Sequence, residues 1–211
     1  MKRLSLSSVT ATSEGDFPTI EPGAYECAVQ SVEDVPEREY FTMAVGVTSG
    51  PRKGFFDSPE FAARPWAHSL TMSYKDAALG MLKGRLERIG EANPGFDAVS
   101  AVEAGRIDML VGRRCFVVFR AEEYYDKKAG EFRIGSPRPS MLCSPDDFRS
   151  GRYADPAPVM MRDARKRDAM RRAGCSEREI SLALDSAAAD AAVAASGRPA
   201  QAADAYDDIP F

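Results

Sequence analysis

Basic and aromatic residues are interleaved in two stretches of this 211-residue chain. In the first stretch, Arg52 and Lys53 stand just before Phe55. The second stretch lies between residues 113 and 138. Arginine and lysine neutralise phosphates, and aromatic rings offer surfaces on which nucleobases stack. The two stretches therefore predict a surface for single-stranded DNA, formed by Arg52, Lys53, Phe55, Arg114, Phe116, Arg120, Tyr124, Lys127, Lys128 and Arg133, with Arg138 extending it.

Each of these side chains also has a structural interpretation. The ring of Phe116 suits a hydrophobic core as well as a stacking platform, whereas Phe119 is expected in the core. Phe55, Phe56 and Trp66 would equally well close one end of a folded domain. A single Lys or Arg is more often solvated than bound to a phosphate. The prediction therefore depends on the group and not on any one member.

Catalytic interpretations have little support in the sequence. The single histidine, His68, excludes mechanisms that use paired histidines, and no G-x-x-x-x-G-K-[ST] loop is present. Asp126, Lys127 and Lys128 match the D-x-K element of metal-dependent nucleases, but they lie in a predicted turn without a suitable preceding acidic residue. We therefore expect a protein that is not an enzyme.

The four cysteines show no C-x-x-C spacing, so we expect neither a metal site nor a cofactor. The cysteines are expected to be reduced thiols, which indicate a cytoplasmic location. No run of 18 apolar residues occurs, so we expect no membrane span.

The last residues, Asp207, Asp208, Ile209, Pro210 and Phe211, have the properties of a peptide ligand. The terminal phenylalanine offers a ring for an apolar pocket and a carboxylate for an arginine or lysine. The proline limits the entropy lost on binding, and the aspartates steer the tip towards basic surfaces. We therefore predict that these five residues bind partner proteins.

This tip resembles the end of bacterial and phage single-stranded-DNA-binding proteins, the SSB family, where an acidic run precedes Ile-Pro-Phe. The resemblance covers residues 206–211 and implies a protein that binds and protects single-stranded DNA in replication, recombination and repair. It also implies partners such as helicases, primases and recombination enzymes. Residues 74–97 are similar to a region of phage-encoded SSB-like proteins, which favours a phage or prophage source. The barrel sequence of typical members is not evident, so their tetramerisation is not carried over.

Charge is segregated along the chain, whose net charge is −4. Residues 106–138 hold eight Lys/Arg against five Asp/Glu, and residues 162–172 hold six against two. Residues 185–211 hold one Arg against five Asp. Basic segments are suited to phosphates, and an acidic end indicates a different role for the tail.

Alternating apolar residues predict strands over 24–32, 40–47 and 113–121. In the first of these, Tyr25, Cys27, Val29 and Ser31 are expected on one face. A period of 3.6 residues predicts a helix over 73–92, ended by Asn93, Pro94 and Gly95. Residues 126–130 predict a hairpin turn, and the returning strand is expected from residue 132 to the prolines at 137 and 139.

These elements favour a mainly β protein with helical additions, namely an OB-fold-like five-stranded barrel with one inserted helix. An α+β sandwich would suit them nearly as well. The predicted organisation is a flexible N-terminus (1–20), the barrel (21–150), a helical segment (151–186), a disordered linker (187–205) and the partner-binding tip (206–211).

The helical segment 159–186 is split at Gly174, and Ser176 with Glu179 predicts a capping box for its second half. Its basic and apolar residues suit a second DNA contact, a homo-oligomer interface or a solvated helix. Two further functions remain open on the sequence. One is strand annealing or recombination mediation, and the other is an adaptor that docks on replication enzymes without binding DNA.

Overall fold

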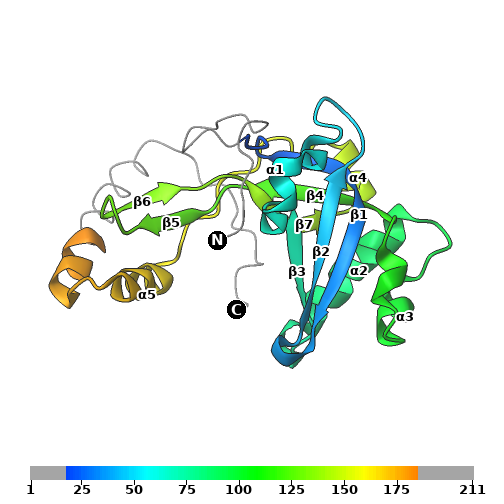
Figure 1. Ribbon diagram of the computed structural model, residues 1–211. Helices are drawn as coiled ribbons and strands as arrows, with labels where there is room; N and C mark the ends of the chain where they lie inside the picture. The colour runs from blue at the N-terminus through cyan, green and yellow to red at the C-terminus, as the bar shows by residue number, and fades with distance from the viewer. Residues whose placement is uncertain (1–17, 185–211) are drawn as a thin grey trace, which may run out of the picture.

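The computed structural model describes residues 18–184 (Figure 1). Five strands form one sheet in the order β3-β2-β1-β4-β7, and every neighbouring pair is antiparallel. The edge strands β3 and β7 also approach each other, so the sheet is a nearly closed barrel. An OB-fold-like barrel is therefore confirmed, with strands β1 (Gly23–Val35), β2 (Tyr40–Val47), β3 (Ser69–Ser73), β4 (Arg114–Arg120) and β7 (Arg138–Cys143).

Strand β1 curls because its register shifts between Val29 and Ser31. Such a bulge bends a strand and increases its twist. Before the bulge, Cys27 and Val29 are buried in the barrel, as predicted. After the bulge, Val32 packs against the core and Ser31 is exposed. The expectation that Ser31 shares the inner face was therefore wrong, because one extra residue reverses the alternation.

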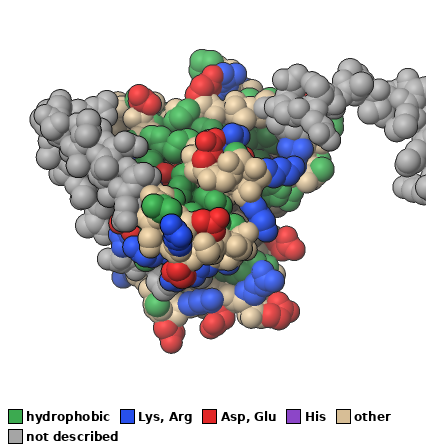
Figure 2. Space-filling view, turned by 90° about the vertical axis from the view of Figure 1, so that its left-hand side faces the viewer, with side chains coloured by type: hydrophobic (Ala, Val, Ile, Leu, Met, Phe, Trp, Pro, Cys, Tyr) green, Lys and Arg blue, Asp and Glu red, His purple; other side chains and the backbone are tan. Residues whose placement is uncertain are grey.

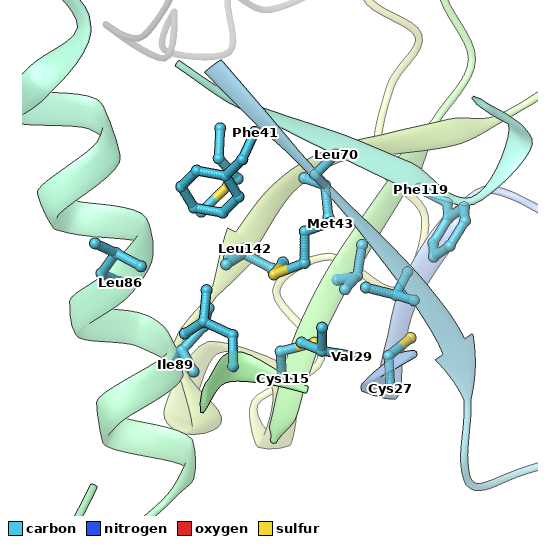
Figure 3. Packing of buried hydrophobic residues seen from close by; sticks show 14 of the residues in the cluster. Cys27, Val29, Phe41, Met43, Leu70, Leu86, Ile89, Cys115, Phe119 and Leu142 are labelled. Carbon is cyan, nitrogen blue, oxygen red and sulfur yellow. The ribbon is translucent and has the colours of Figure 1, made fainter. Parts of the chain in front are cut away.

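Helix α2 (Leu79–Ala92) lies between β3 and β4 in sequence and covers one end of the barrel. Its buried residues Leu82, Leu86 and Ile89 belong to the main core. Figure 3 shows Leu86 and Ile89 facing the interior side chains of the sheet. The predicted inserted helix is confirmed, preceded by a 3-10 turn (Asp76–Ala78) and followed by the short α3 (Ala98–Glu103).

Arg85 of α2 bridges the two edges of the barrel. Its guanidinium donates to the Thr71 carbonyl of β3 at 2.7 Å and to the Ser140 carbonyl of β7 at 3.1 Å. Because the other strand pairs are all antiparallel, β3 and β7 run in the same direction. Burial lowers the pKa of this guanidinium. The side chain thus replaces some of the ladder hydrogen bonds that the two edges lack.

The predicted returning strand does not pair with 113–121. Instead β5 (Glu123–Asp126) and β6 (Glu131–Ile134) form a separate two-stranded sheet, which projects from the barrel (Figure 1). The partner of β4 is β7, whose Pro139 lies at a register irregularity opposite Phe119. A proline has no N–H to donate, so strands carry it at such irregularities or at edges. The prolines that were expected to end a strand therefore begin one.

Helix α5 (Asp163–Ala173) and a second helix over 177–184 pack on the β5–β6 hairpin. Met170, Ile180 and Leu184 form a small core there with Tyr125 and Phe132. Gly174 ends α5 at a φ of 91°. The predicted capping box is present, since the Ser176 amide donates to the Glu179 carboxylate at 2.7 Å. The remaining helices are α1 (Pro59–Ala62) and α4 (Pro145–Arg149).

Candidate nucleic-acid interface

The connection from β2 to β3 carries a cluster of phenylalanines. Phe55, Phe56 and Phe61 pack with ring centroids 5.0–5.3 Å apart. Phe56 is buried and stacks on both His68 and Phe119. This cluster therefore closes one end of the barrel, and only its outer member, Phe55, is partly exposed.

The two basic residues of this connection differ in their surroundings. Arg52 forms an ion pair with Glu21 and lies 5.8 Å from the Phe55 ring centroid. Lys53 is exposed, and no ion pair involves it within residues 18–184. Lys53 is thus the more available of the two for a phosphate.

Trp66 lies on a 3-10 turn (Pro65–Ala67) at the same end of the barrel, with 52% of its surface exposed. The guanidinium of Arg138, at the start of β7, lies 4.6 Å from the indole centroid. Phe55, Arg64 and Pro137 join them around a shallow pocket of about 70 Å³. This pocket, which we call the Trp66 pocket, combines a half-exposed aromatic ring with arginines. It is too small to enclose a nucleobase, so a base would stack on the exposed part of the ring at its rim.

Phe116 and Arg114 both have partners within the folded chain. Phe116 is 6% exposed and stacks on Phe148 at 4.6 Å. Arg114 donates from Nε and Nη2 to the Ala92 carbonyl at 3.2 and 3.1 Å, where α2 ends. It also lies 3.6 Å from the Glu26 carboxylate. Basic groups stabilise the last carbonyls of a helix, so Arg114 has a structural role.

The hairpin presents its two lysines at the tip, where Lys127 and Lys128 are exposed. The Asp126 carboxylate accepts hydrogen bonds from the Ala129 and Lys128 amides, which lower its pKa. It also pairs with Arg133 at 3.2 Å, and Arg133 pairs with Glu131 at 2.7 Å. Asp126 therefore shapes the turn, and Arg133 is held by two carboxylates.

Tyr124 lies opposite Arg133 in the hairpin and is 45% exposed. Its ring borders the hairpin's base, since a Cβ added at Gly135 would lie 3.5 Å from Tyr124 Cδ1. Tyr125 instead points to the small core with α5. Tyr124 is thus the hairpin aromatic that a base could reach.

The far end of the barrel has the opposite charge. The turn between β1 and β2 exposes Glu33, Asp34, Glu37 and Glu39, with Arg38 as its one basic residue. Helix α1 and the base of the β5–β6 hairpin lie at the other end (Figure 1). Viewed from the hairpin side, Lys and Arg side chains lie beside and below an apolar area, with Asp and Glu side chains among them (Figure 2). The acidic turn therefore disfavours an anionic ligand at its own end of the barrel.

The other reactive groups of the described chain are packed away. Cys27, Cys115 and Cys143 are buried, and burial raises the pKa of each thiol. His68 Nδ1 lies 2.9 Å from the Val45 carbonyl oxygen. Within residues 18–184, no group of three or more His, Cys, Asp or Glu side chains could hold a metal ion.

The sequence prediction had Arg138 extending the DNA-binding surface and gave Trp66 only a structural role at one end of the domain. Their approach could not be foreseen, because they are 72 positions apart and meet only when β3 and β7 come together. The usable signal was the single tryptophan of the chain, next to Arg64 and Pro65. The predicted partner-binding residues Asp207, Asp208, Ile209, Pro210 and Phe211 lie outside the described residues.

No protein-family model matches this sequence, and no curated protein is significantly similar to it. No helix among residues 18–184 is long and apolar enough to cross a membrane. The functional proposal therefore depends on the geometry of the barrel and its Trp66 pocket.

Proposed function

We propose that this protein binds single-stranded DNA across the Trp66 pocket. The observation that carries the proposal is the half-exposed Trp66 ring with the Arg138 guanidinium over it, at the basic end of an OB-like barrel. Barrels of this type bind oligonucleotides on the face of strands 2 and 3 and on the loops between strands 1 and 2 and between strands 4 and 5. Here the loop between the last two barrel strands contains the β5–β6 hairpin, whereas the loop between the first two is the acidic β1–β2 turn.

The surroundings of the pocket support a strand that runs towards the hairpin. Lys127 and Lys128 extend the positive charge to the hairpin tip, and Tyr124 offers a second exposed ring on the way. The acidic β1–β2 turn would repel phosphates from the opposite end. We expect stacking on Trp66 and Tyr124 with phosphates along the basic residues.

The first test is fluorescence anisotropy of a labelled oligo-dT at several salt concentrations. Each phosphate contact on a single strand contributes a slope of about −0.7 in log K against log[salt]. The proposal predicts that the affinity falls as salt is added, with a slope equal to that of several phosphate contacts together. Binding that does not change with salt, or no binding of the oligonucleotide, would refute it.

We also propose that residues 207–211 recruit proteins of replication, recombination or repair. The support is the chemistry of the tip and its likeness to the end of SSB-family proteins. A labelled peptide of residues 204–211 should bind purified bacterial helicases or primases and should lose affinity when Phe211 is amidated. Equal binding by the acid and the amide would contradict a role for the terminal carboxylate.

A further inference from the structure

Arg120 and Arg138 are direct partners across the β4–β7 pair. Side chains of such partners leave the same face of a sheet, with Cβ atoms about 4.5–5.5 Å apart. Like charges in this arrangement destabilise a sheet. The pair therefore needs an explanation beyond folding.

Neither arginine has a carboxylate partner in the part of the chain that the structure describes. Arg138 lies over Trp66, and the Arg120 guanidinium lies 5.8 Å from the Tyr153 ring centroid. The Asp147 carboxylate pairs with Arg152 at 3.2 Å, and the Asp147 amide donates to the Ser144 hydroxyl oxygen at 3.0 Å where α4 begins. The two positive charges thus remain uncompensated among residues 18–184.

Arg120 adds a second and independent observation. Its side chain is half-buried, and its Nε–H is fully buried with no hydrogen-bond partner in the described residues. A buried donor without a partner is costly, and the cost is larger for a charged group. An anion that accepts from Arg120 would satisfy this donor, and its negative charge would offset the repulsion of the pair.

We propose that Arg120 and Arg138 form a binding site for one phosphate group beside Trp66. The planar guanidinium fork matches the oxygens of a phosphate, which makes arginine pairs effective phosphate ligands. On the proposed function, the ligand is the backbone phosphate next to the nucleotide whose base stacks on Trp66. The site would fix the position of the DNA strand on the protein, because it holds one phosphate at a set distance from the Trp66 ring.

The first arm of the test uses oligo-dT in which a single linkage is a neutral methylphosphonate, moved along the strand. Anisotropy compares the wild-type chain with Arg120→Gln, Arg138→Gln and Arg149→Gln, the last an exposed arginine of α4 as control. At one linkage position, the methylphosphonate should weaken binding to the wild-type chain about tenfold. At that same position it should weaken binding to Arg120→Gln and Arg138→Gln only slightly, because these variants have already lost the phosphate contact. The control should behave as wild type. Equal losses in every variant at every position would overturn the proposal.

The second arm uses sodium tripolyphosphate in place of DNA, at ionic strength matched with sodium chloride. Ligand binding to the folded state raises its melting temperature. The site predicts a larger rise for wild type than for Arg120→Gln or Arg138→Gln. Arg120→Lys keeps the positive charge but loses the planar guanidinium fork, so its melting temperature should rise by an intermediate amount. A rise in this variant also shows that a substitution at position 120 leaves the chain folded.

The two arms separate this inference from the proposed function. If tripolyphosphate stabilises wild type selectively but oligo-dT does not bind, the phosphate site stands and the DNA function fails. If oligo-dT binds but neither arm distinguishes the arginine variants, the DNA function stands and the phosphate site is refuted.

Discussion

Trp66 is the residue on which the functional proposal depends most. It is a large apolar side chain that exposes about half of its surface. Single exposed apolar residues are common on protein surfaces. The Trp66 ring differs because the Arg138 guanidinium lies over it and because it borders a pocket. Replacing Trp66 with alanine should therefore show whether this ring is an ordinary surface residue or a platform on which a base stacks.

Trp66→Ala should weaken binding of oligo-dT by about 1–3 kcal/mol, because base–aromatic stacking contributes that much per base. Trp66→Phe should recover part of the loss, since a smaller ring remains. Anisotropy of labelled oligo-dT measures both, and far-UV circular dichroism checks that the variants fold. Affinities of both variants equal to wild type would show that no base stacks there.

The buried thiols predict how stability depends on pH. Burial raises the pKa of Cys115 to about 12 and that of Cys143 to about 11, from an ordinary value near 9. In the unfolded chain these thiols ionise near pH 9, so unfolding releases protons between about pH 9 and 11. The free energy of unfolding should therefore fall as the pH rises through this range.

Urea unfolding between pH 7 and 10.5 measures this effect, and Cys143→Ala should flatten the pH dependence. A thiol reagent gives an independent check in native buffer. Cys175, half-buried on the hairpin core, should react well before the other three cysteines. A stability that is constant to pH 10.5 would contradict the burial of these thiols.

At the scale of elements, the barrel depends on contacts between segments that are distant in sequence. Periodicity sufficed for β2, for β4 to within one residue, and for the inserted helix, because their cores have clear apolar repeats. It did not identify β3, a short strand with exposed Thr71, or β7, which contains Pro139. Both strands form because they pair with strands that are distant in sequence, and a local sequence pattern does not contain that information.

The same limit applies to the candidate interface. Lys127 and Lys128 could be selected from the sequence, because a turn exposes its tip regardless of the fold around it. Phe116 could not be placed, because β4 is buried on both faces and an outward ring is covered by Phe148. Which aromatic residue is open depends on how the helices cover the sheet.

Arg85 tests how the barrel closes. Arg85→Met removes donors from the Thr71 and Ser140 carbonyls and should lower the free energy of unfolding by about 1–3 kcal/mol. Lys83→Met, two positions away with its side chain 67% exposed, is the matched control and should change stability by less than about 0.5 kcal/mol. Urea unfolding measures both. Equal stabilities of the two variants would show that the bridge contributes nothing.

At the scale of the whole molecule, the barrel and the hairpin with its helices have separate cores. The main cluster contains residues of all five barrel strands, whereas Met170, Ile180 and Leu184 pack with Tyr125 and Phe132. Lys166 joins the hairpin through an ion pair with Glu123 at 3.1 Å. The hairpin core should therefore be lost without loss of the barrel.

A chain that ends at residue 156 keeps Tyr153 but removes α5 and the helix over 177–184. It should retain a cooperative thermal transition and the near-UV signal of Trp66, because the main cluster remains intact. It should bind oligo-dT more weakly, since the hairpin that carries Lys127 and Lys128 loses its support. A truncated chain without a cooperative transition would show that the two cores fold as one.

Removal of residues 206–211 should leave DNA binding intact or slightly stronger, because these residues carry negative charge and no proposed DNA contact. Anisotropy of oligo-dT with the full chain and the shortened chain measures this. A large loss of affinity in the shortened chain would place the DNA-binding function in the tail.

Titration of the 211-residue chain with unlabelled oligo-dT, followed by tryptophan fluorescence, shows directly whether a DNA strand lies on Trp66. The chain has one tryptophan, so the emission reports Trp66 alone. Stacking of a base predicts strong quenching that saturates with the binding curve from anisotropy and weakens as salt is added. Tight binding with unchanged emission would contradict the account, because the strand would then lie away from the Trp66 pocket.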